Sequence, residues 1–324
     1  DTRPPAARRG GQPGATRQRR RRYKPLAADG RPVPTERLLG EPVAAAVRED
    51  VTSRVRDLRR RGVTPTLGTV LMSDATADER FMDLKHAACD DVGIATRDER
   101  LAPDAPATDL YRTVEGLADD DGVDAVFVQA PLPEHVDTTA VRRRVDPKKD
   151  VDCFHPENLG RLVAGDPRFV PATPAAVRRL LADYGVELDG RDVVVVGRSD
   201  VIGKPLANLL LQDETGGNAT VTVCHSHTAD LAATTQGADV VVTACGVPEL
   251  VDGSMLSPGV VVVDVSANRR ETVDCDVEVV GDVEFESARE TAAAITPVPG
   301  GVGPVTLATL LANVVLAAER RSSG

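Results

Sequence analysis

The hydrophobic pattern from about residue 37 onward alternates between two periods. Stretches with apolar residues every three or four positions predict helices, and they separate short valine-rich runs that predict strands. Those runs are TLGTVLM (66–72), VDAVFVQ (123–129), DVVVVG (192–197), ATVTVC (219–224), ADVVVTAC (238–245) and GVVVVDV (259–265). Because the runs are largely apolar throughout, we expect parallel strands buried on both faces, in an α/β fold.

One predicted helix, DERFMDLKHAACDDVG at 78–93, carries a lysine on its apolar side. At helical spacing, one stripe contains Phe81, Leu84, Lys85, Ala88, Cys89 and Val92. The chain has 34 arginines and only 5 lysines, so an amine at this place suggests chemistry. Burial lowers the pKa of a lysine toward working pH, whereas arginine stays charged. From the residues alone, the preferred interpretation is that Lys85 extends from the stripe toward nearby aspartates.

Three prolines mark the end of one predicted domain and the start of the next, in the segment GDPRFVPATPAAVRRLL, which spans 165–181. Thr173 is suited to cap the helix that follows, and we place a domain boundary near residue 173. A chain of 324 residues with 41% hydrophobic content is long enough for two domain cores.

The second unit opens with a strand, a glycine turn and a helix, DVVVVGRSDVIGKPLANLLL. Gly197 and Gly203 bracket a turn through which backbone N–H groups and a helix N-terminus can approach a diphosphate. After the next strand, where an NAD site usually has an acidic residue, the chain has CHSHT, and Arg198 lies in the turn. This combination favours NADP in a Rossmann-like domain.

Charge is distributed unevenly along the chain. Residues 1–34 carry a net charge of +8 and the remainder carries −19, which together give −11. The first 36 residues are rich in Pro, Gly and Arg, and we expect a disordered basic tail, a solvated extension rather than a nucleic-acid arm. The whole chain has 33 Asp against 17 Glu, a pattern that we associate with high salt and that disfavours nucleic acid as a partner.

The spacing of the cysteines and the hydropathy of the chain indicate the cellular compartment in which the protein works. The five cysteines include no C-x-x-C pair, so we expect neither disulfides nor a zinc site, and a cytoplasmic setting. The histidines of CHSHT lack a further set of ligands, which also argues against a metal. The run TLATLLANVVLAA from 306 is shorter than a bilayer requires and carries Asn313, so we expect a buried helix and no membrane partner.

Five segments together resemble the bifunctional methylenetetrahydrofolate dehydrogenase/methenyltetrahydrofolate cyclohydrolase family. They are VQAPLPEHVD, DPKKDVDCFHPENLGRL, VVVVGRSDVIGKP, CHSHT and ITPVPGGVGPVTLATLL, in the order typical of the family. The resemblance covers residues 38–318 and implies a folate-binding catalytic domain, 37–172 plus 296–320, and an NADP domain, 173–295. It also implies a last helix that returns to the first domain, a homodimer joined through the NADP domains, and a role in one-carbon metabolism, including purine biosynthesis.

The resemblance also assigns site residues. Lys85 would be the general acid/base, Gln129 would orient it, and Asp152 would accept hydrogen bonds from the pterin. The residues implied to contact the folate are Phe81, Pro299, Gly300 and Gly303. Those implied to contact NADP are Gly197, Arg198, Ser199, Gly203, His225, Ser226 and Thr306.

Three departures from the family pattern bear on the expected activity, which is NADP-dependent oxidation of 5,10-methylenetetrahydrofolate followed by hydrolysis to 10-formyltetrahydrofolate. Phe81 stands where Tyr is usual, and Cys153 where Gly is usual. Ser266 and Ala267 replace glycine and isoleucine near the nicotinamide. One alternative is therefore a monofunctional dehydrogenase whose hydrolytic step is weakened by Phe81. Another is a noncatalytic NADP-binding module, which retention of Lys85, Gln129 and Asp152 argues against.

Overall fold

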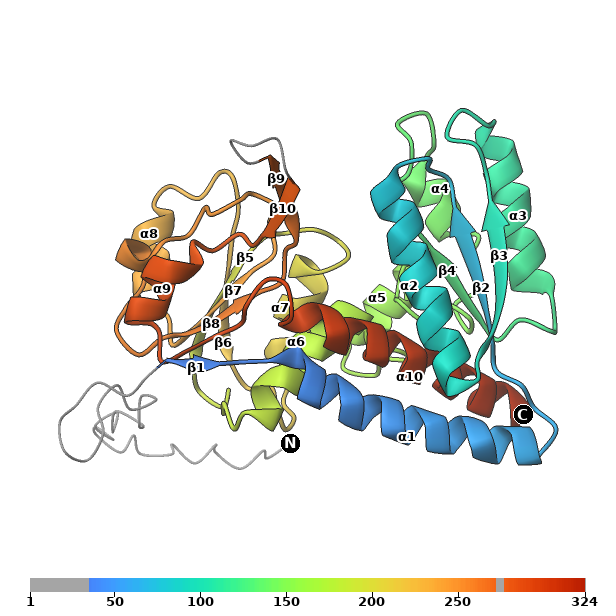
Figure 1. Ribbon diagram of the computed structural model, residues 1–324, viewed down its shortest axis with the longest axis horizontal. Helices are drawn as coiled ribbons and strands as arrows, with labels where there is room; N and C mark the ends of the chain where they lie inside the picture. The colour runs from blue at the N-terminus through green and yellow to red at the C-terminus, as the bar shows by residue number, and fades with distance from the viewer. Residues whose placement is uncertain (1–34, 272–276, 324) are drawn as a thin grey trace, which may run out of the picture.

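The computed structural model describes residues 35–271 and 277–323, which form two lobes standing on a base of long helices (Figure 1). This confirms the two-domain α/β fold. Most of the expected basic tail and Cys275 lie outside the described residues. The last two residues assigned to the tail belong to the fold instead: Thr35 donates hydrogen bonds to two carbonyls of the second lobe, and Glu36 begins strand β1 (Glu36–Arg37).

The first lobe contains a three-stranded parallel sheet in the order β3-β2-β4. Its elements are β2 (Thr66–Leu71), α2 (Thr76–Val92), β3 (Ala95–Arg100), α3 (Ala107–Asp119), β4 (Ala125–Val128), α4 (Thr138–Arg142) and α5 (Pro156–Val163). The strands predicted at 66–72 and 123–129 are confirmed. Strand β3 has the polar sequence ATRDER, because it lies at the edge of the sheet and is only partly covered.

The second lobe contains a six-stranded parallel sheet in the order β1-β11-β8-β7-β5-β6. Its elements are β5 (Asp192–Val196), α7 (Gly203–Leu210), β6 (Thr220–Cys224), α8 (Leu231–Gln236), β7 (Val240–Thr243), η1 (Gly253–Met255), β8 (Val261–Asp264), an antiparallel hairpin of β9 (Asn268–Glu271) and β10 (Val277–Val280), α9 (Phe285–Thr291) and β11 (Ala294–Ile295). All four predicted strands are present. Burial on both faces was wrong for β6, which lies at the edge and is mostly exposed.

The base consists of α1 (Gly40–Arg60), α6 (Ala172–Asp183) and α10 (Val302–Ser322). Helix α10 returns from the second lobe and packs against α1 and α6, with further contacts to α2, β2 and β4 of the first lobe (Figure 1). At 21 residues, α10 is longer than the sequence indicated, and it is long and apolar enough to cross a membrane. Its side chains are largely buried inside the protein, as in a core helix.

The start of α1 closely approaches the loop that precedes α10. The Gly40 amide donates to the Gly300 carbonyl at 2.8 Å. A Cβ atom on Gly40 would lie 1.8 Å from the Gly301 carbonyl oxygen, so only glycine fits without movement of one backbone. The first helix therefore fixes the position of the glycine-rich loop.

We predict that Gly40→Ala lowers the free energy of unfolding by on the order of 1–3 kcal/mol, because overpacking against backbone forces a shift. Gly116→Ala is the matched control. Gly116 lies within α3 with nothing within 4 Å of the added methyl group, so this change should stabilise by about 0.5–1 kcal/mol. Urea unfolding of both variants measures the difference; equal effects would contradict the close approach.

Candidate active site

Helix α2 presents Lys85, but the predicted apolar stripe was partly wrong. The buried positions of the helix are Met82, Cys89 and Val92, whereas Phe81 and Leu84 are 52% and 58% exposed. Lys85 lies at the border between the buried and exposed faces and is half-buried. The exposed pair therefore leaves apolar surface beside the amine, open to a flat ligand.

The Lys85 amine is held by groups from two elements. Its Nζ donates to Gln129 Oε1 at 3.1 Å and to the Phe81 carbonyl at 3.3 Å. It also lies 4.8 Å from the centre of the Phe127 ring in β4, a contact that the sequence did not indicate. Burial lowers the pKa of Lys85, and the negative charges of Asp152 and Asp78 partly oppose that shift.

Gln129 follows directly after β4, as the sequence predicted. Its amide N–H donates to the Val70 carbonyl at 2.9 Å, and its Nε2 donates to the Ala130 carbonyl at 2.8 Å. These bonds leave Oε1 directed at the amine of Lys85. Gln129 therefore presents its side-chain oxygen to the Lys85 amine from a fixed backbone position.

Asp152 lies where three parts of the chain meet. The preceding segment adds to the sheet, since Val126 of β4 forms a parallel bridge with Asp150. Asp152 Oδ1 accepts a hydrogen bond of 2.8 Å from the Ala172 amide at the start of α6. Desolvation raises the pKa of Asp152 to about 6, assisted by the charge of Asp150 and opposed by the Ala172 amide and by Lys85.

Two side chains that sequence reasoning missed hold the Asp152 loop in place. The buried Asp150 carboxylate accepts from the Phe154 and His155 amides at 2.7 and 2.8 Å and from Asn158 Nδ2 at 2.8 Å. Asn313 of α10 donates to the carbonyls of Val151 and Val170 at 2.8 and 2.9 Å. The last helix thus supports both backbone segments that flank Asp152. Asn313, a polar residue inside an apolar run, was the one signal in the sequence.

Cys153 adopts a left-handed backbone, with φ of 55°. This is the conformation that glycine favours, so the backbone here suits the glycine that the family resemblance leads us to expect. The side chain is accommodated by burial: Cys153 Sγ donates to the Phe169 carbonyl at 2.9 Å, and burial raises the pKa of the thiol. With Cys153 in this conformation, Asp152 accepts its hydrogen bond from the Ala172 amide.

The glycine-rich loop connects β11 to α10. Pro299, Gly300 and Gly303 are exposed, and Thr306 lies half-buried near the start of α10. The loop is anchored at one end by Thr296, whose hydroxyl accepts from the Asp264 amide at 2.7 Å, and at the other by the contact with Gly40. No contact between the described residues joins this loop to Lys85, so its approach to a folate is still a prediction.

The turn after β5 has the geometry expected of a diphosphate cradle. Gly197 has φ of 135°, and a Cβ there would lie 2.2 Å from the Ala244 carbonyl oxygen. A Cβ on Gly203 would lie 2.2 Å from the Gly197 carbonyl oxygen. Ser199 Oγ accepts from the Ile202 and Gly203 amides at 3.1 and 3.4 Å. At Gly197 and Gly203 the backbone is thus packed too closely for a side chain. Such close packing suits a turn that brings a helix N-terminus to a phosphate.

The residues expected to read the 2′-phosphate lie at one edge of the sheet. Val196 of β5 pairs with Cys224 of β6, and Arg198 and Ser226 each follow two residues later. Both are exposed, and within residues 35–271 and 277–323 no carboxylate pairs with Arg198. His225 Nδ1 accepts from the His227 amide at 3.2 Å. The parallel register therefore brings a free guanidinium and a hydroxyl to the same edge.

Two buried carboxylates, also missed from the sequence, hold the neighbouring loops. Asp264 accepts from the Val283 amide at 2.8 Å and the Thr243 hydroxyl at 3.0 Å. Asp282 accepts from the Val247 amide at 2.8 Å and from Ser266 Oγ at 2.7 Å. Burial alone would raise the pKa of Asp282, but hydrogen bonds from Ser266 and its other donors lower it. Ser266 thus contributes a hydrogen bond where glycine is usual. We find no contact that explains Ala267.

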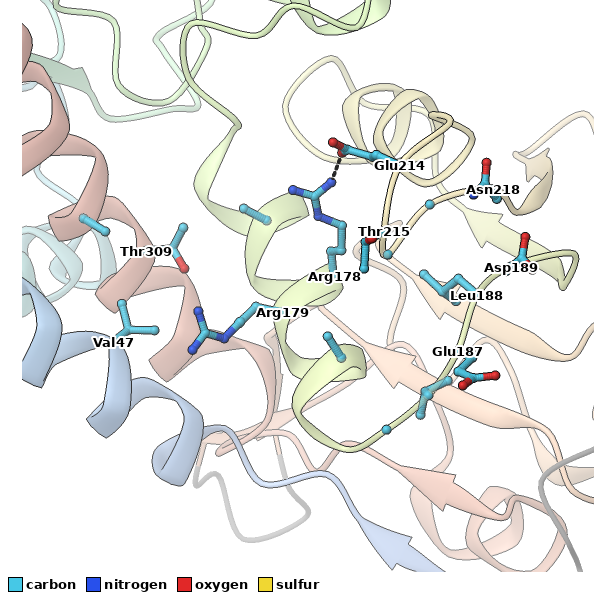
Figure 2. A pocket seen from close by; sticks show the side chains of 17 residues that line it. Val47, Arg178, Arg179, Glu187, Leu188, Asp189, Glu214, Thr215, Asn218 and Thr309 are labelled. Carbon is cyan, nitrogen blue, oxygen red and sulfur yellow. Dashed lines mark hydrogen bonds and ion pairs between the residues drawn. The ribbon is translucent and has the colours of Figure 1, made fainter.

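A separate pocket lies beside the base. It has a volume of about 780 Å³ and is lined by α6, the 185–189 loop and the 214–218 loop (Figure 2). Arg178 and Glu214 pair across it. It contains none of the residues assigned to either site, so it is distinct from both.

The chain matches two family models over nearly its whole described length. Residues 38–152 match the model for the catalytic domain of tetrahydrofolate dehydrogenase/cyclohydrolase, and residues 171–322 match the NAD(P)-binding domain of the same enzyme. The chain is 55% identical over 292 residues to the bifunctional protein FolD of Halobacterium salinarum, covering 89% of this chain and 97% of that protein. It is 54% identical over 283 residues to FolD of Haloquadratum walsbyi, covering 87% and 91%.

Solved structures give the same result. The methylenetetrahydrofolate dehydrogenase-cyclohydrolase of Trypanosoma brucei, complexed with NADP and an inhibitor, is 37% identical with a TM-score of 0.84, covering 90% of this chain and 99% of that one. The bifunctional FolD of Campylobacter jejuni is 36% identical with a TM-score of 0.83, covering 89% and 99%.

The electrostatic link between Lys85 and Asp152 leads to a prediction. Carbon NMR of the labelled Asp152 carboxyl should show a titration midpoint near pH 6. In Lys85→Met the midpoint should rise, because the charge that favours the carboxylate is lost. Lys148→Met, which removes an exposed lysine from the same segment as Asp152, should leave the midpoint unchanged. A midpoint that does not move in Lys85→Met would show that the two groups do not interact.

Proposed function

The chain belongs to the tetrahydrofolate dehydrogenase/cyclohydrolase family, and we propose that it oxidises 5,10-methylenetetrahydrofolate with NADP and hydrolyses the methenyl product to 10-formyltetrahydrofolate. One observation carries the assignment of the chemistry: a half-buried lysine amine of lowered pKa, hydrogen-bonded to Gln129, shares its electrostatic environment with Asp152. Burial favours the neutral form of such an amine, and the neutral form is the one that can accept a proton.

Folate binds the first lobe in this proposal. Asp152 accepts hydrogen bonds from the N–H groups of the pterin, and a carboxylate gives strong, directional bonds to such donors. The exposed ring of Phe81 stacks on the flat part of the substrate. These contacts place the one-carbon bridge beside the amine of Lys85.

NADP fits the second lobe. The turn that contains Gly197, Ser199 and Gly203 would hold the diphosphate, and Arg198 with Ser226 would hold the 2′-phosphate. When bound, the oxidised nicotinamide supplies the acceptor for a hydride from the one-carbon bridge. The protein contributes alignment of the two ligands across the lobes, which is the main requirement of this step.

Hydrolysis requires proton transfers by residues of the first lobe alone. Water adds to the cationic methenyl carbon while the neutral amine of Lys85 accepts one of its protons. The ammonium then gives a proton to the ring nitrogen as the carbon–nitrogen bond breaks, and the added hydroxyl loses its proton to the amine as it becomes the formyl oxygen. The amine finally releases that proton to solvent. Gln129 keeps the amine directed at the reacting atoms throughout.

We predict that Lys85→Met abolishes hydrolysis of the methenyl compound while NADP binding stays nearly intact, because the amine moves the protons and lies in the other lobe. Stopped-flow decay of methenyl absorbance and a titration of NADP measure the two properties. The control is Lys148→Met, which removes an exposed lysine and should retain both. Equal loss of hydrolysis and NADP binding in Lys85→Met would identify a structural lysine instead.

We also propose that the protein acts in the cytoplasm as a homodimer joined through its NADP domains. The exposed edge of β6 supports this arrangement, since Val223 is 36% exposed and one side of the strand has no partner strand among the described residues. Light scattering in molar salt should give twice the chain mass of 34.2 kDa. A mass equal to one chain would reject the dimer.

A further inference from the structure

An ion pair joins the two lobes directly. Arg142, at the end of α4 in the first lobe, lies with Nη1 3.0 Å from Asp200 Oδ2 in the glycine turn of the second. The Arg142 side chain is only 16% exposed, so the pair is screened by salt less than the surface pairs are. Lys204, in the first turn of α7 and four residues after Asp200, also bonds to Asp200, at 2.5 Å.

Arg142 is also packed against the loop that carries Asp152. Its guanidinium lies 4.8 Å from the centre of the Phe154 ring, and the Phe154 amide donates to the buried Asp150 carboxylate. Asp150 and Phe154 lie on either side of Asp152 in sequence. A continuous set of contacts therefore connects the loop that carries Asp152 to the cofactor turn.

The charges of Arg142, Asp200 and Lys204 suit a position beside a diphosphate. A carboxylate in a phosphate-binding turn repels the ligand, so Asp200 alone would weaken the site. Arg142 and Lys204 supply two positive charges against one negative, and the group of three is positive overall. Loss of Arg142 would leave a neutral pair and would also remove this direct contact between the turn and the first lobe.

We propose that Arg142 and Asp200 are positioning residues for hydride transfer, which fix the cofactor turn relative to the folate lobe. This inference rests on the proposed function. Hydride transfer needs both ligands aligned, so it depends on the pair. Hydrolysis uses Lys85, Gln129 and Asp152, all from the first lobe, so hydrolysis does not depend on the Arg142–Asp200 pair.

The two activities of one sample provide the test. Dehydrogenase and cyclohydrolase rates are measured in molar salt for the wild type, Arg142→Leu, Asp200→Asn and the double variant. Arg143→Leu, which removes the exposed neighbouring arginine, is the matched control. We expect Arg142→Leu to lower dehydrogenase kcat by roughly tenfold or more, because a small misplacement of reacting atoms is costly. Hydrolysis should stay within about twofold of the wild type, as should both activities of Arg143→Leu.

The double variant tests whether the two residues act as a pair. Its dehydrogenase rate should be no lower than that of the worse single variant, because each single change already breaks the contact. Arg142→Lys, which keeps the charge, should retain more activity than Arg142→Leu.

Three results would overturn the inference. One is an unchanged dehydrogenase rate in Arg142→Leu, and another is a parallel loss of both activities, which would indicate a merely structural arginine. The third is an additive loss in the double variant. A wild type without either activity would reject the proposed function together with this inference, whereas an active wild type beside an unaffected variant rejects the inference alone.

Discussion

The packing of α10 between α1 and α6 is the constraint on which both lobes depend. This helix continues from the second lobe through the glycine-rich loop, packs on α1 and α6 of the base, and contacts α2, β2 and β4 of the first lobe. Its buried Asn313 holds the carbonyls of Val151 and Val170, the two segments that meet at Asp152. A buried amide without those partners would cost free energy, so the position of the helix and that of the loop determine each other.

The protein uses its many carboxylates in two physically different ways. Most are exposed and solvated, as in proteins that work at high salt, and the haloarchaeal relatives share more than half of their residues with this chain over the matched region. Among the described residues four are buried, and three of these accept hydrogen bonds from several backbone amides: Asp150, Asp264 and Asp282. Each fixes a loop near one of the two sites. Screening by salt weakens contacts of the first kind far more than those of the second.

The hydrophobic patterns along the chain predicted the features that depend mainly on nearby residues, such as the central strands. The valine-rich runs gave the central strands, because a strand covered on both faces must be apolar whatever surrounds it. The same rule missed β3 and overestimated the burial of β6, since edge strands carry polar or exposed residues. Periodicity placed Phe81, Leu84 and Lys85 on one apolar stripe of α2 but did not indicate which part of that stripe is buried. Phe81 and Leu84 are exposed beside the amine, an arrangement that periodicity alone does not distinguish from a core face. The roles of Asp150, Asn313 and Asp282 arise from contacts distant in sequence and had no local signal beyond their polarity.

The most direct test of the account is a time course of methenyl-folate absorbance after the protein is mixed with methylenetetrahydrofolate and NADP in molar salt. The account predicts a rise, as the dehydrogenase forms the methenyl compound, followed by a decay faster than uncatalysed hydrolysis. That result would show both activities in a chain with Phe81 beside Lys85. A rise that persists would contradict the hydrolytic role of Lys85, and no rise in a folded sample would contradict the assignment as a whole.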